Sequence, residues 1–134
     1  MKQALMVVGA TSHAGKSLLC AAICRLLSRQ GWRVSPFKGQ NMALNAYVTN
    51  AVYEICDAQA GQAWSAGIEP TVEMNPILLK PQGDMTSQVI LNGKAVGRTQ
   101  AQQYYEQYFE RGWAAIQTAL AVLREKYDYI VCEG

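Results

Sequence analysis

The chain has 134 residues, the usual size of one domain, and half of them are hydrophobic, which is enough for a sizeable core. Charged residues make up 16% and the formal net charge is +2, too small to indicate binding to nucleic acid or to an anionic membrane surface. The apolar stretches are strand-sized, and no basic segment precedes an apolar one at the N-terminus. We therefore expect no transmembrane helix, no signal peptide and a cytoplasmic protein.

The first part of the chain predicts a strand, a glycine-rich loop, a helix and a second strand. Residues 3–9 form an uninterrupted apolar run that predicts a short buried strand. A helix is expected from Lys16 to Gln30, with Gly31 as its C-cap glycine and a strand over 33–38 after it. The predicted buried face of the helix is formed by Leu19, Ile23, Leu26 and Leu27. This βαβ unit predicts an α/β fold of the P-loop NTPase type, with a parallel sheet and helices on both of its faces.

The rest of the chain alternates between strands and helices with less regularity. The amide-rich segment that follows the second strand has no clean period, whereas residues 54–66 predict a helix that ends at Gly67. The segments MNPILLKP and SQVILNGK each predict a strand, and a long helix is expected from Thr99 to Lys126. The final segment, DYIVCEG, predicts a buried strand. Because such a strand needs neighbours and covering helices, we expect these residues to be a fragment of a longer product.

Four cysteines are present, and none forms a C-x-x-C pair. Cys20 and Cys24 are four residues apart on one face of the predicted helix, a spacing that could supply two metal ligands. Free cysteine is among the most buried residue types and packs as a small hydrophobe. We therefore interpret all four, including Cys56 and Cys132, as core residues in the reduced state.

The strongest motif is G-A-T-S-H-A-G-K-S at residues 9–17, between the first strand and the first helix. A glycine-rich turn into a helix N-terminus offers free backbone N–H groups and the positive end of the helix dipole to a phosphate. Lys16 is expected to reach the β- and γ-phosphates, and the Ser17 hydroxyl to ligate Mg²⁺. The spacing departs from the common motif, because five residues separate Gly9 from Gly15. The predicted nucleotide-binding residues are Gly9, Thr11, Ser12, Ala14, Gly15, Lys16 and Ser17, whereas His13 is interpreted as a solvated loop residue.

Acidic and basic side chains are expected beside the phosphate loop. Glu133 closes the last strand and is the candidate Mg²⁺ ligand, since P-loop proteins usually place an acid at the end of a neighbouring strand. Lys38 ends the second strand and thus lies at the same edge of the sheet, where a second lysine could neutralise a transferred phosphoryl group. Glu54 and Asp57 open the predicted helix over 54–66; spacing alone leaves open whether they interact with the helix dipole or whether one is a second Mg²⁺ ligand.

Several longer stretches carry a resemblance to a known family. PFKGQNMALNAYVT, EICDAQAGQA, MNPILLKPQGDMTSQVILNGK, a YY-containing helix and YDYIVCEG together resemble the N-terminal ATP-binding domain of cobyric acid synthases. The resemblance covers nearly the whole chain, and FKGQNMALN and MNPILLKP are more specific than the phosphate loop. The wider superfamily includes dethiobiotin synthetase, and its phosphate loops share the G-x5-GK(S/T) spacing.

The resemblance implies a reaction, cofactors and roles for individual residues. Cobyric acid synthases use ATP, Mg²⁺ and glutamine to amidate four carboxylates of a corrin ring in cobalamin biosynthesis. Residue by residue, the resemblance implies Lys16, Lys38 and Glu133 as catalytic residues and Ser17, Glu54 and Glu133 as metal ligands. It places the corrinoid substrate at Lys38, Gln40, Asn41 and Asn45. In the family a glutaminase domain with a cysteine and a histidine follows this domain; since His13 is the only histidine, we expect that domain to be absent from these residues and full activity to need it.

Three alternatives stay open at this point. The first is another carboxylate-activating enzyme of the dethiobiotin synthetase type, although MNPILLKP argues against it. The second is a partition-type ATPase that acts as a dimerising switch; such switches usually carry an additional lysine early in the loop, where Ala10 and Thr11 stand. The third is a non-catalytic nucleotide-binding module. The oligomeric state is left open, and a homodimer is compatible with the sequence.

Overall fold

A computed structural model of the chain describes residues 2–11 and 15–134. The first and last strands of the chain belong to a small parallel sheet. This sheet has three strands, in the order β1-β9-β2. Strand β1 spans Gln3–Val7, β2 spans Val34–Phe37 and β9 spans Tyr129–Glu133. Both neighbours of β9 run parallel to it, so the carboxyl ends of the three strands lie at one edge. The predicted pairing of the first and last strands in one parallel sheet is confirmed.

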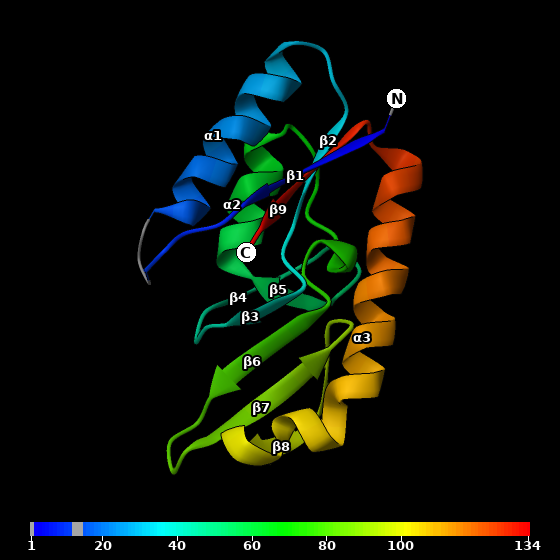
Figure 1. The fold of residues 1–134 in the computed structure, drawn as a ribbon. Helices are drawn as coiled ribbons and strands as arrows, with labels where there is room; N and C mark the ends of the chain where they lie inside the picture. Colours follow the sequence, from blue (N-terminus) through cyan, green and yellow to red (C-terminus); the bar gives the residue numbers. More distant parts are fainter. Residues whose placement is uncertain (1, 12–14) are drawn as a thin grey trace.

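Helices cover both faces of this sheet, as the sequence predicts. Helices α1 (Lys16–Arg29) and α2 (Asp57–Ser65) lie on one side, and α3 (Ala101–Lys126) lies on the other (Figure 1). Because side chains alternate along a strand, β9 contributes to both layers. Val131 packs in a cluster with Cys20 and Cys24 of α1, whereas Ile130 packs in a cluster with Leu123 of α3.

A second sheet extends the molecule beyond the parallel one. It contains β3 (Gln40–Met42), β6 (Ile77–Pro81), β7 (Thr86–Leu91) and β8 (Lys94–Gln100), in that order. Strands β3 and β6 are parallel, and the other two pairings are antiparallel. The strands predicted in MNPILLKP and SQVILNGK are thus confirmed, whereas β8 was not predicted. Helix α3 runs alongside both sheets and packs against each of them (Figure 1).

The helix predicted over 54–66 begins later than expected. Residues Glu54–Cys56 form strand β5, which pairs in antiparallel fashion with β4 (Ala46–Val48), and the helix proper starts at Asp57. Tertiary hydrogen bonds hold this segment extended: the Glu54 N–H donates to the Gly93 carbonyl (3.0 Å), and the Cys56 N–H donates to Asn75 Oδ1 (3.0 Å). The prediction that Glu54 opens a helix is therefore wrong. A short 3₁₀ helix, η1 (Val72–Met74), follows α2.

Two predicted burial patterns also differ from the structure. Strand β1 is largely exposed, since it pairs with β9 on one side only and forms an edge of the three-stranded sheet. In α1 the fully buried positions are Cys20 and Cys24, with Ile23 and Leu27 packed beside them. Leu19 and Leu26 are 51% and 62% exposed, so the buried face of α1 is rotated from the one predicted.

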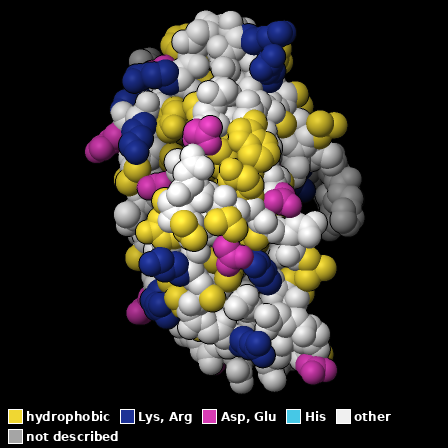
Figure 2. Space-filling view, turned by 180° about the vertical axis from the view of Figure 1, so that it is seen from behind, with side chains coloured by type: hydrophobic (Ala, Val, Ile, Leu, Met, Phe, Trp, Pro, Cys, Tyr) yellow, Lys and Arg dark blue, Asp and Glu magenta, His cyan; other side chains and the backbone are white. Residues whose placement is uncertain are grey.

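All four cysteines are free and buried, which confirms their interpretation as core residues. Burial raises the pKa of Cys20 to about 11 and that of Cys24 to about 12, so both thiols stay protonated at neutral pH. Among the described helices, none combines the length and the hydrophobicity that a membrane-spanning segment requires. On the face seen from behind, basic and acidic side chains are interspersed among hydrophobic ones (Figure 2).

Candidate nucleotide-binding site

The phosphate loop leaves β1 and enters α1 at Gly15 and Lys16. Gly9 and Thr11 are described, whereas Ser12, His13 and Ala14 lie outside the described residues. Gly15 has φ +82°, a left-handed conformation that glycine adopts without steric cost, and Lys16 is the first helical residue. The first turn of a helix leaves backbone N–H groups without intrahelical partners, which makes this junction suited to an anion.

Three predicted residues meet at the carboxyl edge of the parallel sheet. Glu133 Oε2 accepts a hydrogen bond from Ser17 Oγ (3.0 Å) and forms an ion pair with Lys38 Nζ (2.9 Å). The residues come from α1, from the end of β9 and from the position after β2. The parallel topology brings them together, because all three segments reach the same edge.

The charges in this cluster are held in a sheltered environment. The Glu133 side chain is 3% exposed and the Lys38 side chain 18%. Burial acts to raise the pKa of Glu133, but hydrogen bonds from Lys38 and Gln62, the Lys38 charge and the Ser17 hydroxyl outweigh it, so the pKa of Glu133 lies below its ordinary value. Glu133 is therefore ionised at neutral pH, with the Lys38 ammonium group as its counter-ion.

Sequence reasoning missed two glutamines and an asparagine around this cluster. Gln62 Nε2 donates to Glu133 Oε1 (2.9 Å), and Gln59 accepts a hydrogen bond from the predicted substrate residue Asn41 (3.1 Å). Asn75 donates to the carbonyls of Lys38 (2.9 Å) and Ile77 (3.0 Å), and so fixes the chain where it passes from the first sheet to the second. A signal was present, since Gln59 and Gln62 share one face of α2 with the buried Ala60 and Ala63.

The predicted substrate residues are spread along β3 and the loop after it. Gln40 Oε1 accepts a hydrogen bond from the Tyr104 hydroxyl (2.7 Å), and both residues line a cavity of about 230 Å³ together with Met42 of β3. Asn45 is exposed, and the described residues form no hydrogen bond with its side chain. A larger cavity of about 540 Å³ lies between α3 and η1, and its lining includes none of the predicted site residues.

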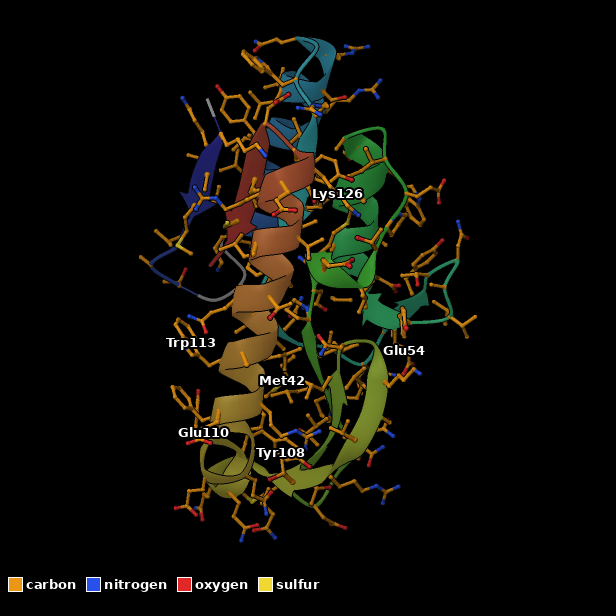
Figure 3. All side chains as sticks on the ribbon, turned by 90° about the vertical axis from the view of Figure 1, so that its right-hand side faces the viewer. Met42, Glu54, Tyr108, Glu110, Trp113 and Lys126 are labelled. Atoms are coloured by element: carbon orange, nitrogen blue, oxygen red, sulfur yellow. The ribbon has the colours of Figure 1, made fainter. Side chains whose placement is uncertain are left out.

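Glu54 is not among the residues that hydrogen-bond to Glu133 in the described part of the chain. It is the first residue of β5, to the right of the α3 ribbon in Figure 3, and its carboxylate forms an ion pair with Lys80 of β6. The Ser17 hydroxyl and the Glu133 carboxylate, by contrast, offer two adjacent oxygen atoms. The described residues contain no cluster of three or more histidine, cysteine or acidic side chains. Such a sparse set of oxygen ligands fits Mg²⁺, which usually keeps several waters and shares substrate phosphates.

A parallel sheet, a glycine-to-helix junction after its first strand and an acid at the end of the neighbouring strand define a nucleotide-binding domain of the P-loop class. The model of the CobQ/CobB/MinD/ParA nucleotide binding domain family matches residues 5–127. The chain belongs to this family. The match includes the phosphate loop, Lys38 and both buried glutamines, whereas the whole of β9, with Glu133, lies beyond it.

Close relatives share most of the sequence. The chain is 74% identical over 131 residues to the cobyric acid synthase of Acaryochloris marina, and 75% identical over 131 residues to that of Synechococcus elongatus. It is also 70% identical over 132 residues to the cobyric acid synthase of Thermosynechococcus vestitus. Each alignment covers 98% of this chain but only 26% or 27% of the relative, so the chain spans about a quarter of the length of these relatives.

Proposed function

We propose that this chain supplies the MgATP-binding part of an enzyme that activates corrin-ring carboxylates for amidation, as in cobyric acid synthase. The observation that supports the proposal best is the cluster in which Glu133 Oε2 is bound by both Ser17 and Lys38 at the phosphate-loop edge. An ion pair with a purely structural role could form anywhere in the core. Its position beside the phosphate loop therefore favours a role in nucleotide binding. The high identity to cobyric acid synthases favours this member of the family over a partition-type switch.

The site residues would bind the phosphates, the Mg²⁺ ion and the corrinoid substrate. Lys16 and the backbone around Gly15 bind the β- and γ-phosphates, and Ser17 and Glu133 hold Mg²⁺, which would neutralise phosphate charge. Lys38 offers its ammonium group to the transferred phosphoryl group, and Gln40, Asn41 and Asn45 face the corrinoid. Glu54 as a further Mg²⁺ ligand stays a prediction.

A carboxylate is a poor electrophile, and its phosphorylation by ATP would convert it into a reactive acyl phosphate. A carboxylate oxygen attacks the γ-phosphorus, the bond to the β-phosphate oxygen breaks, and ADP leaves. Ammonia then attacks the carbonyl carbon of the acyl phosphate, phosphate leaves with the former carboxylate oxygen, and the nitrogen loses a proton. The protein mainly aligns the two substrates and stabilises the phosphoryl charge.

The nitrogen donor and the setting of the reaction are also proposed. Ammonia would come from a glutaminase domain elsewhere in the full-length protein, of which these residues would form the ATP-binding domain. The four reduced cysteines agree with the cytoplasm as the location.

The acyl-phosphate route is tested by following oxygen. The full-length protein is incubated with ATP, Mg²⁺, ammonia and a corrin a,c-diamide whose carboxylates carry ¹⁸O. Label is expected in the released phosphate in proportion to the amide formed. Amide without labelled phosphate would rule out the acyl phosphate, and ATP hydrolysis without any amide would favour the partition-type switch.

A further inference from the structure

Two glutamine side chains are buried in α2 next to the nucleotide site. Gln59 is 0% exposed and Gln62 is 1% exposed. A buried primary amide costs free energy unless its N–H donors and its oxygen acceptor form hydrogen bonds. Both glutamine side chains therefore need hydrogen-bond partners inside the protein. They lie one turn apart, close enough to contact each other.

The Gln62 amide connects the two segments that form the nucleotide site. Its nitrogen donates to Glu133 Oε1 (2.9 Å) and to the backbone carbonyl of Ser17 (3.2 Å). An amide nitrogen has two hydrogens, and both are thereby used. Gln62 therefore links the end of β9 to the first turn of α1.

Asn41, Gln59 and Gln62 form a chain of hydrogen bonds that ends at the Glu133 carboxylate. The charge of this carboxylate determines which atom of each amide donates and which accepts. An ionised carboxylate only accepts hydrogen bonds, so Gln62 must turn its NH₂ group toward Glu133 and its oxygen toward Gln59. Gln59 donates to that oxygen (3.5 Å) and accepts from Asn41 Nδ2 (3.1 Å) with its own. Rotating either glutamine amide by half a turn would place two donors or two acceptors against each other.

The two carboxylate oxygens of Glu133 therefore have different surroundings. Oε1 is bound by Gln62 on the α2 side, whereas Oε2 is the oxygen that meets Ser17 and Lys38. We propose that Gln62, oriented by Gln59, is a positioning residue that fixes Glu133 so that Oε2 alone is presented to the divalent cation beside Ser17. This inference rests on the proposed function, because it assumes that the cation binds there.

The test measures how much Mg²⁺ strengthens nucleotide binding. The full-length protein is titrated with the non-hydrolysable analogue AMP-PNP, once in excess Mg²⁺ and once in EDTA, and the ratio of the two Kd values is called the magnesium enhancement. Gln62→Met keeps the length of the side chain but removes its donors. Loss of a group that orients a metal ligand typically weakens metal affinity by 10–100-fold, so the enhancement should fall by about that factor while the Kd in EDTA stays unchanged.

Two further variants complete the design. Gln62→Asn keeps an amide but is too short to reach both partners, and should give the same loss; it carries the test if Gln62→Met does not fold. Gln117→Met, an exposed glutamine of α3, is the matched control and should leave the enhancement unchanged.

The magnesium enhancement of the unmodified protein tests the proposed cation site, and its change in the Gln62 variants tests the positioning role. No magnesium enhancement in the unmodified protein would refute the proposed cation site itself. A normal enhancement in the unmodified protein that persists in folded Gln62→Met would overturn the positioning role alone. Equal weakening in Mg²⁺ and in EDTA would also overturn it, since a merely structural residue would affect both.

Discussion

Glu133 shows how one buried charge is accommodated by its neighbours. Its carboxylate accepts hydrogen bonds from Ser17, Lys38 and Gln62, each at 3.0 Å or less. Burying an isolated carboxylate would be costly, so these contacts are needed to keep the group ionised in this position. The same contacts hold it beside the phosphate loop.

Replacing Glu133 by glutamine keeps the size of the side chain and removes its charge. The new NH₂ group would also face donors, whichever way the amide is turned. We expect turnover of the full-length protein, assayed with ammonia in place of glutamine, to fall by about two to three orders of magnitude, as for the loss of one preorganised electrostatic group. Glu110→Gln, at an exposed position of α3, should be neutral. Turnover within about twofold of the unmodified protein in folded Glu133→Gln would exclude the role.

The predictable part of the site is the part fixed by topology. Parallel strands end at one edge, so the positions of Lys38 and Glu133 at their strand ends were enough to predict that both lie at the edge of the phosphate loop, although their mutual ion pair was not predicted. Gln62 could not be predicted in the same way. The sequence places Gln59 and Gln62 on one face of α2 together with alanines, but it does not show that this face turns toward the end of β9.

Among the elements, the turn between β7 and β8 is formed by an Asn-Gly pair, a local sequence signal for a β-hairpin. Asn92 and Gly93 have φ values of +49° and +83°, the conformation that an Asn-Gly pair adopts in a tight hairpin. This pair predicts the antiparallel pairing of the two strands. Strand β5 is the opposite case, because its extended conformation depends on distant partners, Gly93 and Asn75, which no local pattern indicates.

Three glycine-to-alanine substitutions separate backbone strain from steric overlap. In Gly93→Ala the added Cβ would lie 2.7 Å from Tyr53 Cγ at a positive φ, so we expect a loss of about 3 kcal/mol in the free energy of unfolding. Among the described residues, no atom lies within 4 Å of the Cβ that Gly15→Ala adds, so this change should cost only the strain of its positive φ, about 1–2 kcal/mol.

Gly61 provides the control for both substitutions. It lies inside α2 without a positive φ, and beyond its own helix backbone no atom of the described residues lies within 4 Å of an added Cβ. Gly61→Ala should therefore stabilise the chain by up to about 1 kcal/mol. Urea unfolding followed by circular dichroism gives all three values. A Gly93→Ala variant as stable as Gly61→Ala would contradict the packing described around the hairpin.

For the molecule as a whole, α3 is the element that joins the nucleotide site to the second sheet. Its 26 residues contribute Leu123 to the core of the parallel sheet and Tyr104 to the core of the second one. Tyr104 also binds Gln40, the first residue of β3. The proposed corrinoid-facing segment is thus held between α3 and β6, next to the edge where the nucleotide would bind.

The claim at the centre of this account is that the edge around Lys16, Ser17 and Glu133 binds MgATP. Calorimetric titration of the full-length protein with ATP in excess Mg²⁺, compared between the unmodified protein and Lys16→Ala, tests that claim most directly. We predict saturable binding to the unmodified protein. Lys16→Ala should bind about 10–100-fold more weakly at an unchanged melting temperature, because a charge-assisted contact to phosphate is lost. A folded Lys16→Ala variant that binds MgATP as tightly as the unmodified protein would contradict the account.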